Sequence, residues 1–243
     1  MRQWIAAAGL IMMGLSGCNM QNALTENQQP QQRPRLTMQE VIPPMAPATP
    51  EAVEQQNRFL KENTNRFKSR QMAGKYYVLQ AKRTFNEEKL DSAIVFFNRA
   101  WLMDRNNNEV YWGYGLVYGQ QQEYDKALYI LYRALDKDKE NPRLLTDIAT
   151  THLARFYQQS SPDDLQQSKK LLERAVQLHP DDAADTFYKL AVNSYYLYEF
   201  AQAWDYLHQS IRQDKSKEDR QLISALLQHE RDPEGIYTAQ RKR

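Results

Sequence analysis

The sequence is short of several residue types, and each shortage excludes a class of structure. Cys18 is the only cysteine among 243 residues, so no disulfide within the chain can stabilise the fold. The four histidines are scattered, without a second ligand at helical or turn spacing, and give a zinc site little support. The formal net charge is only +2, so no overall positive field indicates a nucleic-acid partner.

Glycine is also scarce: the chain has 8, and after Pro50 only five remain. That region has long amphipathic segments and no strand-like alternation between tight turns, which predicts an all-helical fold. It lacks a phosphate loop, a nucleophile elbow and a metalloprotease motif. Gly113 and Gly115 lack the third glycine of a dinucleotide fingerprint and are interpreted as close helix contacts. An enzyme would require a perturbed carboxylate or histidine cluster in a closed pocket, and no motif in the sequence indicates one. We therefore expect no catalysis and no cofactor.

The first 17 residues have the pattern of a targeting segment. Arg2 is followed by an apolar run, residues 4–15, that is shorter than the roughly 20 residues of a membrane-spanning helix. Leu-Ser-Gly-Cys, ending at Cys18, resembles the lipobox of bacterial lipoproteins. The resemblance implies a signal peptide over residues 1–17 and a lipid such as palmitate on Cys18 that anchors the protein to a membrane. The alternative is an ordinary secretory signal whose cysteine is incidental.

Asn19 follows the cysteine where many inner-membrane lipoproteins have aspartate, so the family's sorting rule indicates the outer membrane. Residues 19–25 contain no acidic side chain, which favours the periplasmic face. Residues 18–50 are rich in proline and glutamine, and this composition predicts a disordered tether. Its segment VIPPMAPATP, residues 41–50, is interpreted as a spacer, with a ligand for a groove on another protein as the alternative.

A repeated pattern runs through the rest of the chain. Aligning residues 91–107 with residues 125–141 superposes apolar and small residues at an offset of 34. Two more copies follow at 168–182 and 201–215, the first with seven extra residues before it that a longer loop or lengthened helices would absorb. Small residues recur at one place in the second helices, namely Ala100, Ala134, Ala175 and Ser210, and at another in the preceding helices, namely Ala81, Gly115, Ala149 and Ala191.

A 34-residue unit with these small residues resembles the tetratricopeptide repeat (TPR), a pair of antiparallel helices. The resemblance implies an all-α, right-handed solenoid of about four helix pairs. We expect an array over residues 71–216, with units at about 74–107, 108–141, 142–182 and 183–216. An extra helix is expected over residues 51–70, a capping helix over 217–230 and a basic tail over 231–243.

The resemblance also implies a concave groove lined by the first helix of each unit. Family positions that tend to touch an extended peptide or a partner helix fall here on Lys75, Val78, Lys82, Phe85, Trp112, Leu116, Gln120, Arg143, Thr146, Tyr188, Val192, Tyr195 and Tyr196. We call these thirteen residues the groove set. Aromatic anchors beside cationic side chains are suited to a protein partner, although several of the aromatics could instead be core residues.

The sequence therefore predicts a membrane-anchored scaffold that mediates protein–protein interactions in a bacterial envelope. Its partner would be a protein rather than a nucleic acid. The alternative is an envelope protein that binds a small molecule or glycan among Tyr188, Tyr195 and Tyr196.

Overall fold

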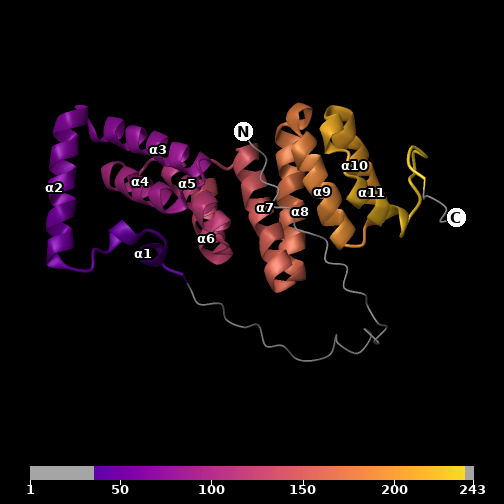
Figure 1. Cartoon of the computed structure of the whole chain (residues 1–243), viewed down its shortest axis with the longest axis horizontal. Helices are drawn as coiled ribbons and strands as arrows, with labels where there is room; N and C mark the ends of the chain where they lie inside the picture. The colour runs from indigo at the N-terminus through magenta and orange to yellow at the C-terminus, as the bar shows by residue number, and fades with distance from the viewer. Residues whose placement is uncertain (1–35, 239–243) are drawn as a thin grey trace, which may run out of the picture. The chain divides into compact units, whose positions relative to one another are not determined.

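The structure, a computed structural model, describes residues 36–238, and every regular element in that range is a helix (Figure 1). Cys18, the signal segment and the last five residues lie outside the described part. The α-helices are α1 Met38–Val41, α2 Pro50–Phe67, α3 Arg70–Asn86, α4 Leu90–Met103, α5 Asn108–Gln120, α6 Tyr124–Lys137, α7 Pro142–Gln159, α8 Pro162–Leu178, α9 Ala184–Tyr196, α10 Phe200–Gln213 and α11 Arg220–Leu227.

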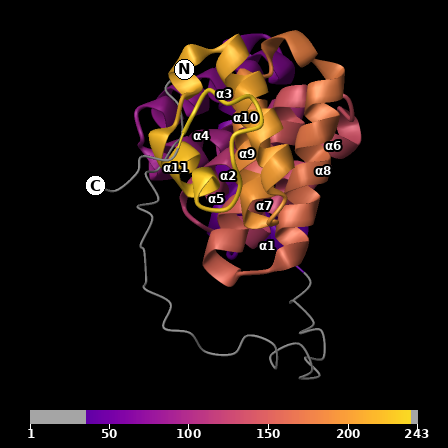
Figure 2. The ribbon, with the colours of Figure 1, turned by 90° about the vertical axis from the view of Figure 1, so that its right-hand side faces the viewer.

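The helices from α3 to α10 form four successive pairs, as the repeat pattern predicts. The pairs are α3 with α4, α5 with α6, α7 with α8, and α9 with α10, and each pair also packs against the next. Figure 2 shows this stack from its C-terminal end, with α10 and α11 toward the viewer. The predicted α-solenoid is confirmed for the described residues.

Small residues allow this close packing. All eight small residues that recur in the sequence pattern are buried. A Cβ atom added to Gly113 would lie 2.1 Å from the ring of Phe97, and one added to Gly115 would lie 2.3 Å from Leu131. Both glycines are therefore packing residues, because any larger side chain would overlap the neighbouring helix.

Three of the four turns within pairs have the same construction. Glu88, Gln122 and Tyr198 each have a φ near +60°. In each turn the next residue donates its N–H to a carbonyl five residues earlier at 2.9 Å, as in a Schellman-type end to the first helix. The chain thus reverses direction at these positions without glycine.

The seven extra residues of the third unit lengthen its helices. Compared with α5 and α6, α7 ends five residues later and α8 begins three residues earlier, while the turn between them shortens by one. Only Ser160 and Ser161 connect the two helices, and Ser160 has a φ of 54°. Of the two alternatives left by the sequence, the lengthened helices are the correct one.

The expected tether boundary at residue 50 is wrong for residues 36–49, which pack on the repeats. Val41 and Ile42 are both 0% exposed, and the hydroxyl of Tyr118 in α5 donates to the Val41 carbonyl at 2.7 Å. The Gln56 side chain donates to the Pro44 carbonyl at 3.1 Å. Buried apolar residues and these two hydrogen bonds attach this segment, although its average composition is that of a linker.

The three other flanking predictions have different outcomes. The extra helix is α2, which contacts α3, and the capping helix is α11. The expected tail after residue 230 is instead attached as far as it is described. Asp232 is buried and lies 2.7 Å from the ring nitrogen Nε2 of His208, and Tyr237 stacks on Trp204.

Candidate functional site

The first helices of the four pairs, α3, α5, α7 and α9, carry the groove set. Twelve of its thirteen members are half-buried or exposed, and Val78 is the exception. Val78 is 3% exposed and belongs to the core, so its assignment to the groove is wrong. Its short side chain does not extend beyond the packed surface, whereas Trp112 and Tyr188 at the same place in their units are long enough to do so. Phe85 is half-buried and packs against the same core.

Polar contacts join each of these helices to the next. The indole N–H of Trp112 in α5 donates to Asp147 in α7 at 2.7 Å, and Lys82 in α3 lies 2.9 Å from Glu109 in α5. The hydroxyl of Tyr188 in α9 donates to Asp219, next to α11, at 2.6 Å. Two groove aromatics are therefore held in one orientation by carboxylates of the following element.

Asp185 in α9 forms a second cluster of charges on this surface. Lys189 pairs with it from one turn away, and Lys217, which is only 7% exposed, lies 3.0 Å from it. Burial raises the pKa of Asp185, but the two ammonium groups outweigh that effect and the pKa is lowered overall. This carboxylate is consequently ionised and paired.

Asp147 has the opposite shift. Burial raises its pKa to about 6, against the lowering effects of the Trp112 hydrogen bond and of nearby Lys189 and Arg143. The carboxyl group that accepts the hydrogen bond of Trp112 therefore gains a proton just below neutral pH. Sequence reasoning missed Asp147 and Asp219, because neither lies at a family contact position. For Asp147 a signal was available, since an acidic residue stands 35 residues, about one repeat, after Trp112.

Aromatic rings gather where α7 and α9 end. Tyr196 contacts Phe156 and Tyr157 with ring centroids 5.6 and 5.3 Å apart, and Tyr195 lies 5.5 Å from Tyr196. Tyr157, which was not in the groove set, is 46% exposed. Tyr195 and Tyr196 are therefore part of a partly exposed cluster that extends beyond the expected contact positions.

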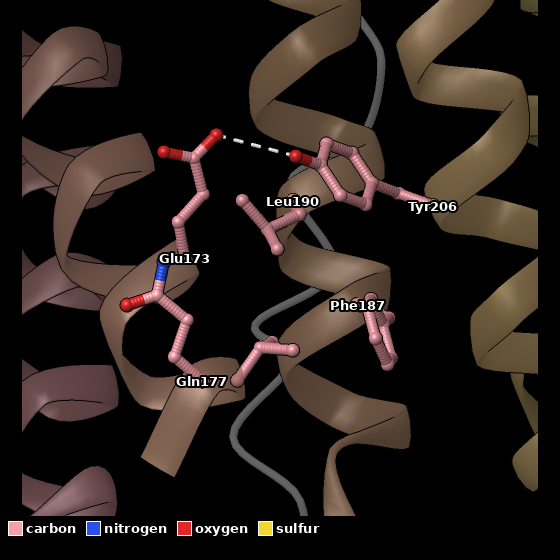
Figure 3. A pocket seen from close by; sticks show the side chains of 6 residues that line it. Glu173, Gln177, Phe187, Leu190 and Tyr206 are labelled. Atoms are coloured by element: carbon pink, nitrogen blue, oxygen red, sulfur yellow. Dashed lines mark hydrogen bonds between the residues drawn. The ribbon is translucent and has the colours of Figure 1, made fainter. Parts of the chain in front are cut away.

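A cavity of about 270 Å³ lies between α8, α9 and α10 (Figure 3). It is lined by Glu173, Val176, Gln177, Phe187, Leu190 and Tyr206, and the Tyr206 hydroxyl donates to Glu173 at 3.2 Å. None of these residues belongs to the groove set. The cavity thus does not coincide with the tyrosines proposed for a small ligand.

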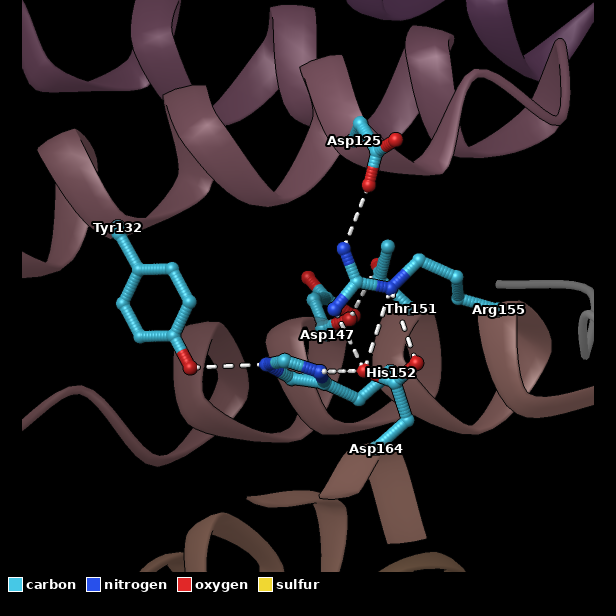
Figure 4. A network of polar contacts seen from close by, with 7 residues as sticks. All are labelled: Asp125, Tyr132, Asp147, Thr151, His152, Arg155 and Asp164. Carbon is cyan, nitrogen blue, oxygen red and sulfur yellow. Dashed lines mark hydrogen bonds and ion pairs between the residues drawn. The ribbon is translucent and has the colours of Figure 1, made fainter. Parts of the chain in front are cut away.

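A buried polar network joins α6, α7 and α8 (Figure 4). Asp164 accepts hydrogen bonds from the guanidinium of Arg155, the shortest at 2.6 Å, and lies 2.7 Å from Nδ1 of His152. The Tyr132 hydroxyl lies 2.8 Å from the other ring nitrogen, and Arg155 also reaches Asp125 at 2.6 Å.

The order hydroxyl, imidazole and carboxylate in this network is that of a catalytic relay, but its environment is structural. Asp164 is 1% and His152 is 5% exposed. Burial also raises the pKa of the Tyr132 hydroxyl, which opposes its activation as a nucleophile. Arg155 and Asp164 both lie in the added turns of the third unit, so these contacts fasten the lengthened helices together.

Two further properties concern only residues 36–238. No group of three or more histidine, aspartate or glutamate side chains in this range is placed to hold a metal ion. No helix in the same range is both long and apolar enough to span a bilayer.

Comparison with solved structures identifies the architecture. A structure of PilF from Pseudomonas aeruginosa matches with a TM-score of 0.55 at 19% identity, over 65% of this chain and 68% of that one. A thermophilic TPR protein of Thermus thermophilus matches with a TM-score of 0.53 at 16% identity, over 64% and 80%. The fold is that of a tetratricopeptide-repeat protein.

A third TPR-fold match extends further along the chain. MamA from Desulfovibrio magneticus RS-1 has a TM-score of 0.53 at 13% identity and covers 70% of this chain and 87% of that one. No family model and no curated protein sequence matches. At these identities the likeness establishes the TPR fold alone.

Proposed function

We propose that this protein is an adaptor that binds a protein partner in the groove of its TPR array. The observation that carries the proposal is the fixed presentation of aromatic side chains along successive first helices. Trp112 and Tyr188 are only half-buried, yet each is oriented by a hydrogen bond at 2.7 Å or less. Anchors that are ordered before binding lose little conformational entropy when a partner arrives.

The partner is an extended peptide or a helix with apolar side chains spaced to meet these anchors. Site-specific photo-crosslinking in cells tests this, with the crosslinker at Leu116 or Arg143, which lie on α5 and α7 beside the anchors. Lys170, exposed on α8, is the matched control. Capture of the same protein from both groove positions and not from Lys170 supports the proposal, and its loss in Trp112→Ala would assign the anchor. Equal capture from all three positions would contradict it.

We further propose that Cys18 carries a lipid and that the adaptor is held at the periplasmic face of a bacterial outer membrane. The lipobox-like Leu-Ser-Gly-Cys supports this. Metabolic labelling with a palmitate analogue in a bacterial host, followed by membrane fractionation, is the test. Cys18→Ser is expected to abolish labelling and to release the protein from membranes. Unchanged labelling in the variant would reject the anchor.

A glycan or small molecule is the second candidate for the same surface. The cluster of Tyr157, Tyr195 and Tyr196 favours it, because partly exposed aromatic faces can stack on sugar rings. Thermal-shift measurements with envelope glycans distinguish the two candidates. Stabilisation that disappears in Tyr157→Ala would favour the glycan.

A further inference from the structure

The solvent side of α3 is apolar as well as cationic. Met72, Tyr76 and Leu79 are 55%, 38% and 63% exposed, and their spacing of four and three residues puts them in one stripe along the helix. Lys75, Lys82 and Arg83 are exposed beside the stripe. We call these six residues the N-terminal face. It adjoins the groove, with which it shares the two lysines.

In later units the part of this side that corresponds to Tyr76 and Arg83 is covered. The residues 34 and 68 positions after Tyr76 are Val110 and Leu144, and both are 0% exposed. Those at the same offsets from Arg83, Val117 and Thr151, are also buried. The cover is the preceding helix pair, since α5 packs against α3 and α4, and α7 packs against α5 and α6. Tyr76 and Arg83 therefore lie at positions that are buried under another helix in later units, whereas the positions of Met72, Lys75 and Lys82 are not buried there.

The helix α2 does not provide this cover. It reaches α3 mainly at Tyr77, through the Phe59 ring and a hydrogen bond at 2.6 Å to Asn63, and only the Phe67 ring approaches Tyr76. Figure 1 shows α2 crossing the N-terminal end of the stack. By contrast, the exposed residues of the last helix, α11, are Arg220, Gln221 and Ser224, as expected of a cap with a polar outer surface.

Charge limits what can lie on the N-terminal face. Residues 58–86 contain eight lysines and arginines but only one acidic residue, Glu62. Within the described range, Lys82 and Arg83 have the exposed partners Glu109 and Glu87, and both pairs are in contact with water. A helix that buries the stripe must therefore bring carboxylates of its own.

Two candidates for covering the N-terminal face come from this sequence itself, namely the residues outside 36–238 and the C-terminal end of a second copy. Neither complements the face. Outside residues 36–238 the only acidic residue is Glu26. The outer surface of α11 is polar, so the C-terminal end of a second copy does not complement an apolar stripe.

We propose that the N-terminal face binds an acidic amphipathic α-helix of a partner protein, in the place that a preceding helix pair occupies in later units. The face shares Lys75 and Lys82 with the groove set, but its apolar stripe contains no member of that set, so a substitution in the stripe tests this proposal separately.

Fluorescence anisotropy with two labelled synthetic helices and the full chain tests the proposal. Both peptides carry leucine at i, i+3, i+4 and i+7; one has glutamate and the other lysine at its remaining positions. The acidic peptide is expected to bind at least about tenfold more tightly at low salt. Leu79→Glu should weaken its binding by about tenfold or more, whereas Val95→Glu, at a 45% exposed site on α4, should leave it within about twofold.

Equal affinity for the two peptides, binding of neither, or an unchanged affinity in Leu79→Glu would overturn the proposal. Matching circular dichroism melting curves show that the variants are folded. Sedimentation with phosphatidylglycerol vesicles tests whether the face binds a bilayer. Sedimentation velocity of the protein alone tests whether it binds a second copy. Loss of vesicle binding or of self-association in Leu79→Glu, without binding of the acidic peptide, would assign the surface to a bilayer or a second copy. Crosslinking at Leu116 and Arg143 reports on the groove separately.

Discussion

Replacing Asp164 by asparagine is expected to destabilise the protein strongly. Asp164 is 1% exposed, and it accepts hydrogen bonds of 2.6, 3.0 and 3.2 Å from Arg155, which is itself 7% exposed. Asparagine keeps the shape but removes the negative charge, which leaves the guanidinium with the half-exposed Asp125 as its remaining anionic partner. Breaking a buried ion pair in this way costs about 3–5 kcal/mol of the free energy of unfolding.

Urea unfolding followed by circular dichroism at 222 nm measures this loss. Asp125→Asn is the matched control: its side chain is 50% exposed, so its removal should cost no more than about 1 kcal/mol. The double variant Arg155→Met, Asp164→Leu removes both buried charges and should recover most of the stability lost by Asp164→Asn. A loss below about 1 kcal/mol for Asp164→Asn, or a double variant less stable than the single, would refute this reasoning.

The pH dependence gives an independent check on the same group. Burial raises the pKa of Asp164, but the hydrogen bonds from Arg155 and His152 outweigh it and the pKa is lowered overall. The stabilisation is therefore present above the carboxyl pKa of the unfolded chain, near 3.9, and is lost as the pH falls through the lower pKa of the folded state. Asp164→Asn should lack this component of the acid unfolding profile.

Three further predictions concern packing, titration and the N-terminal segment. Gly113→Ala should cost about 1–3 kcal/mol in urea unfolding because of overlap with an α4 ring, whereas Gly119→Ala, whose nearest new contact would be 3.9 Å away, should be neutral or stabilising. The pKa of Asp147 is raised to about 6, so the folded state binds a proton that the unfolded chain has lost, and the free energy of unfolding should fall by at most about 3 kcal/mol as the pH rises from 4 to 6. Asp147→Asn should remove that slope, and an unchanged slope would contradict the shift. Tyr118→Phe, which removes the hydrogen bond to Val41, should cost about 1 kcal/mol and speed proteolysis before residue 50, and unchanged cleavage would show that this contact does not hold the segment.

The helix pairs could be predicted because their packing leaves a periodic record in the sequence. Ala81, Gly115, Ala149 and Ala191 are small for a reason that recurs in every unit, so their offsets of 34, 34 and 42 reveal them. The attachment of residues 36–49 leaves no such record. It depends on a few contacts, chiefly those of Val41 and Ile42, and composition averaged over a proline-rich window does not resolve single residues.

The exposure of the groove set was predictable only as far as backbone position determines it. Positions in the repeat indicate which residues lie on the groove side, but they do not tell how far a side chain extends, so Val78 was misplaced. They also do not give the contacts between units. Whether Trp112 donates a hydrogen bond to Asp147 depends on how two side chains of different units are oriented. The sequence of a single repeat does not contain that information.

Those contacts decide how a groove partner and a partner of the N-terminal face should differ in their response to salt. In the groove, Asp185 is already paired with Lys189 and Lys217, so a carboxylate from a partner would exchange one ion pair for another and gain little. Affinity there should come from Trp112, Tyr188 and their neighbours, and raising the salt concentration should change it little. On the N-terminal face the pairs Lys82–Glu109 and Arg83–Glu87 are exposed, and an acidic helix would place further carboxylates beside them and beside Lys75, so binding should weaken as salt screens these charges. Anisotropy titrations of both ligands across a salt series measure the difference, and a groove ligand more sensitive to salt than the acidic helix would show that these ion pairs do not neutralise the groove.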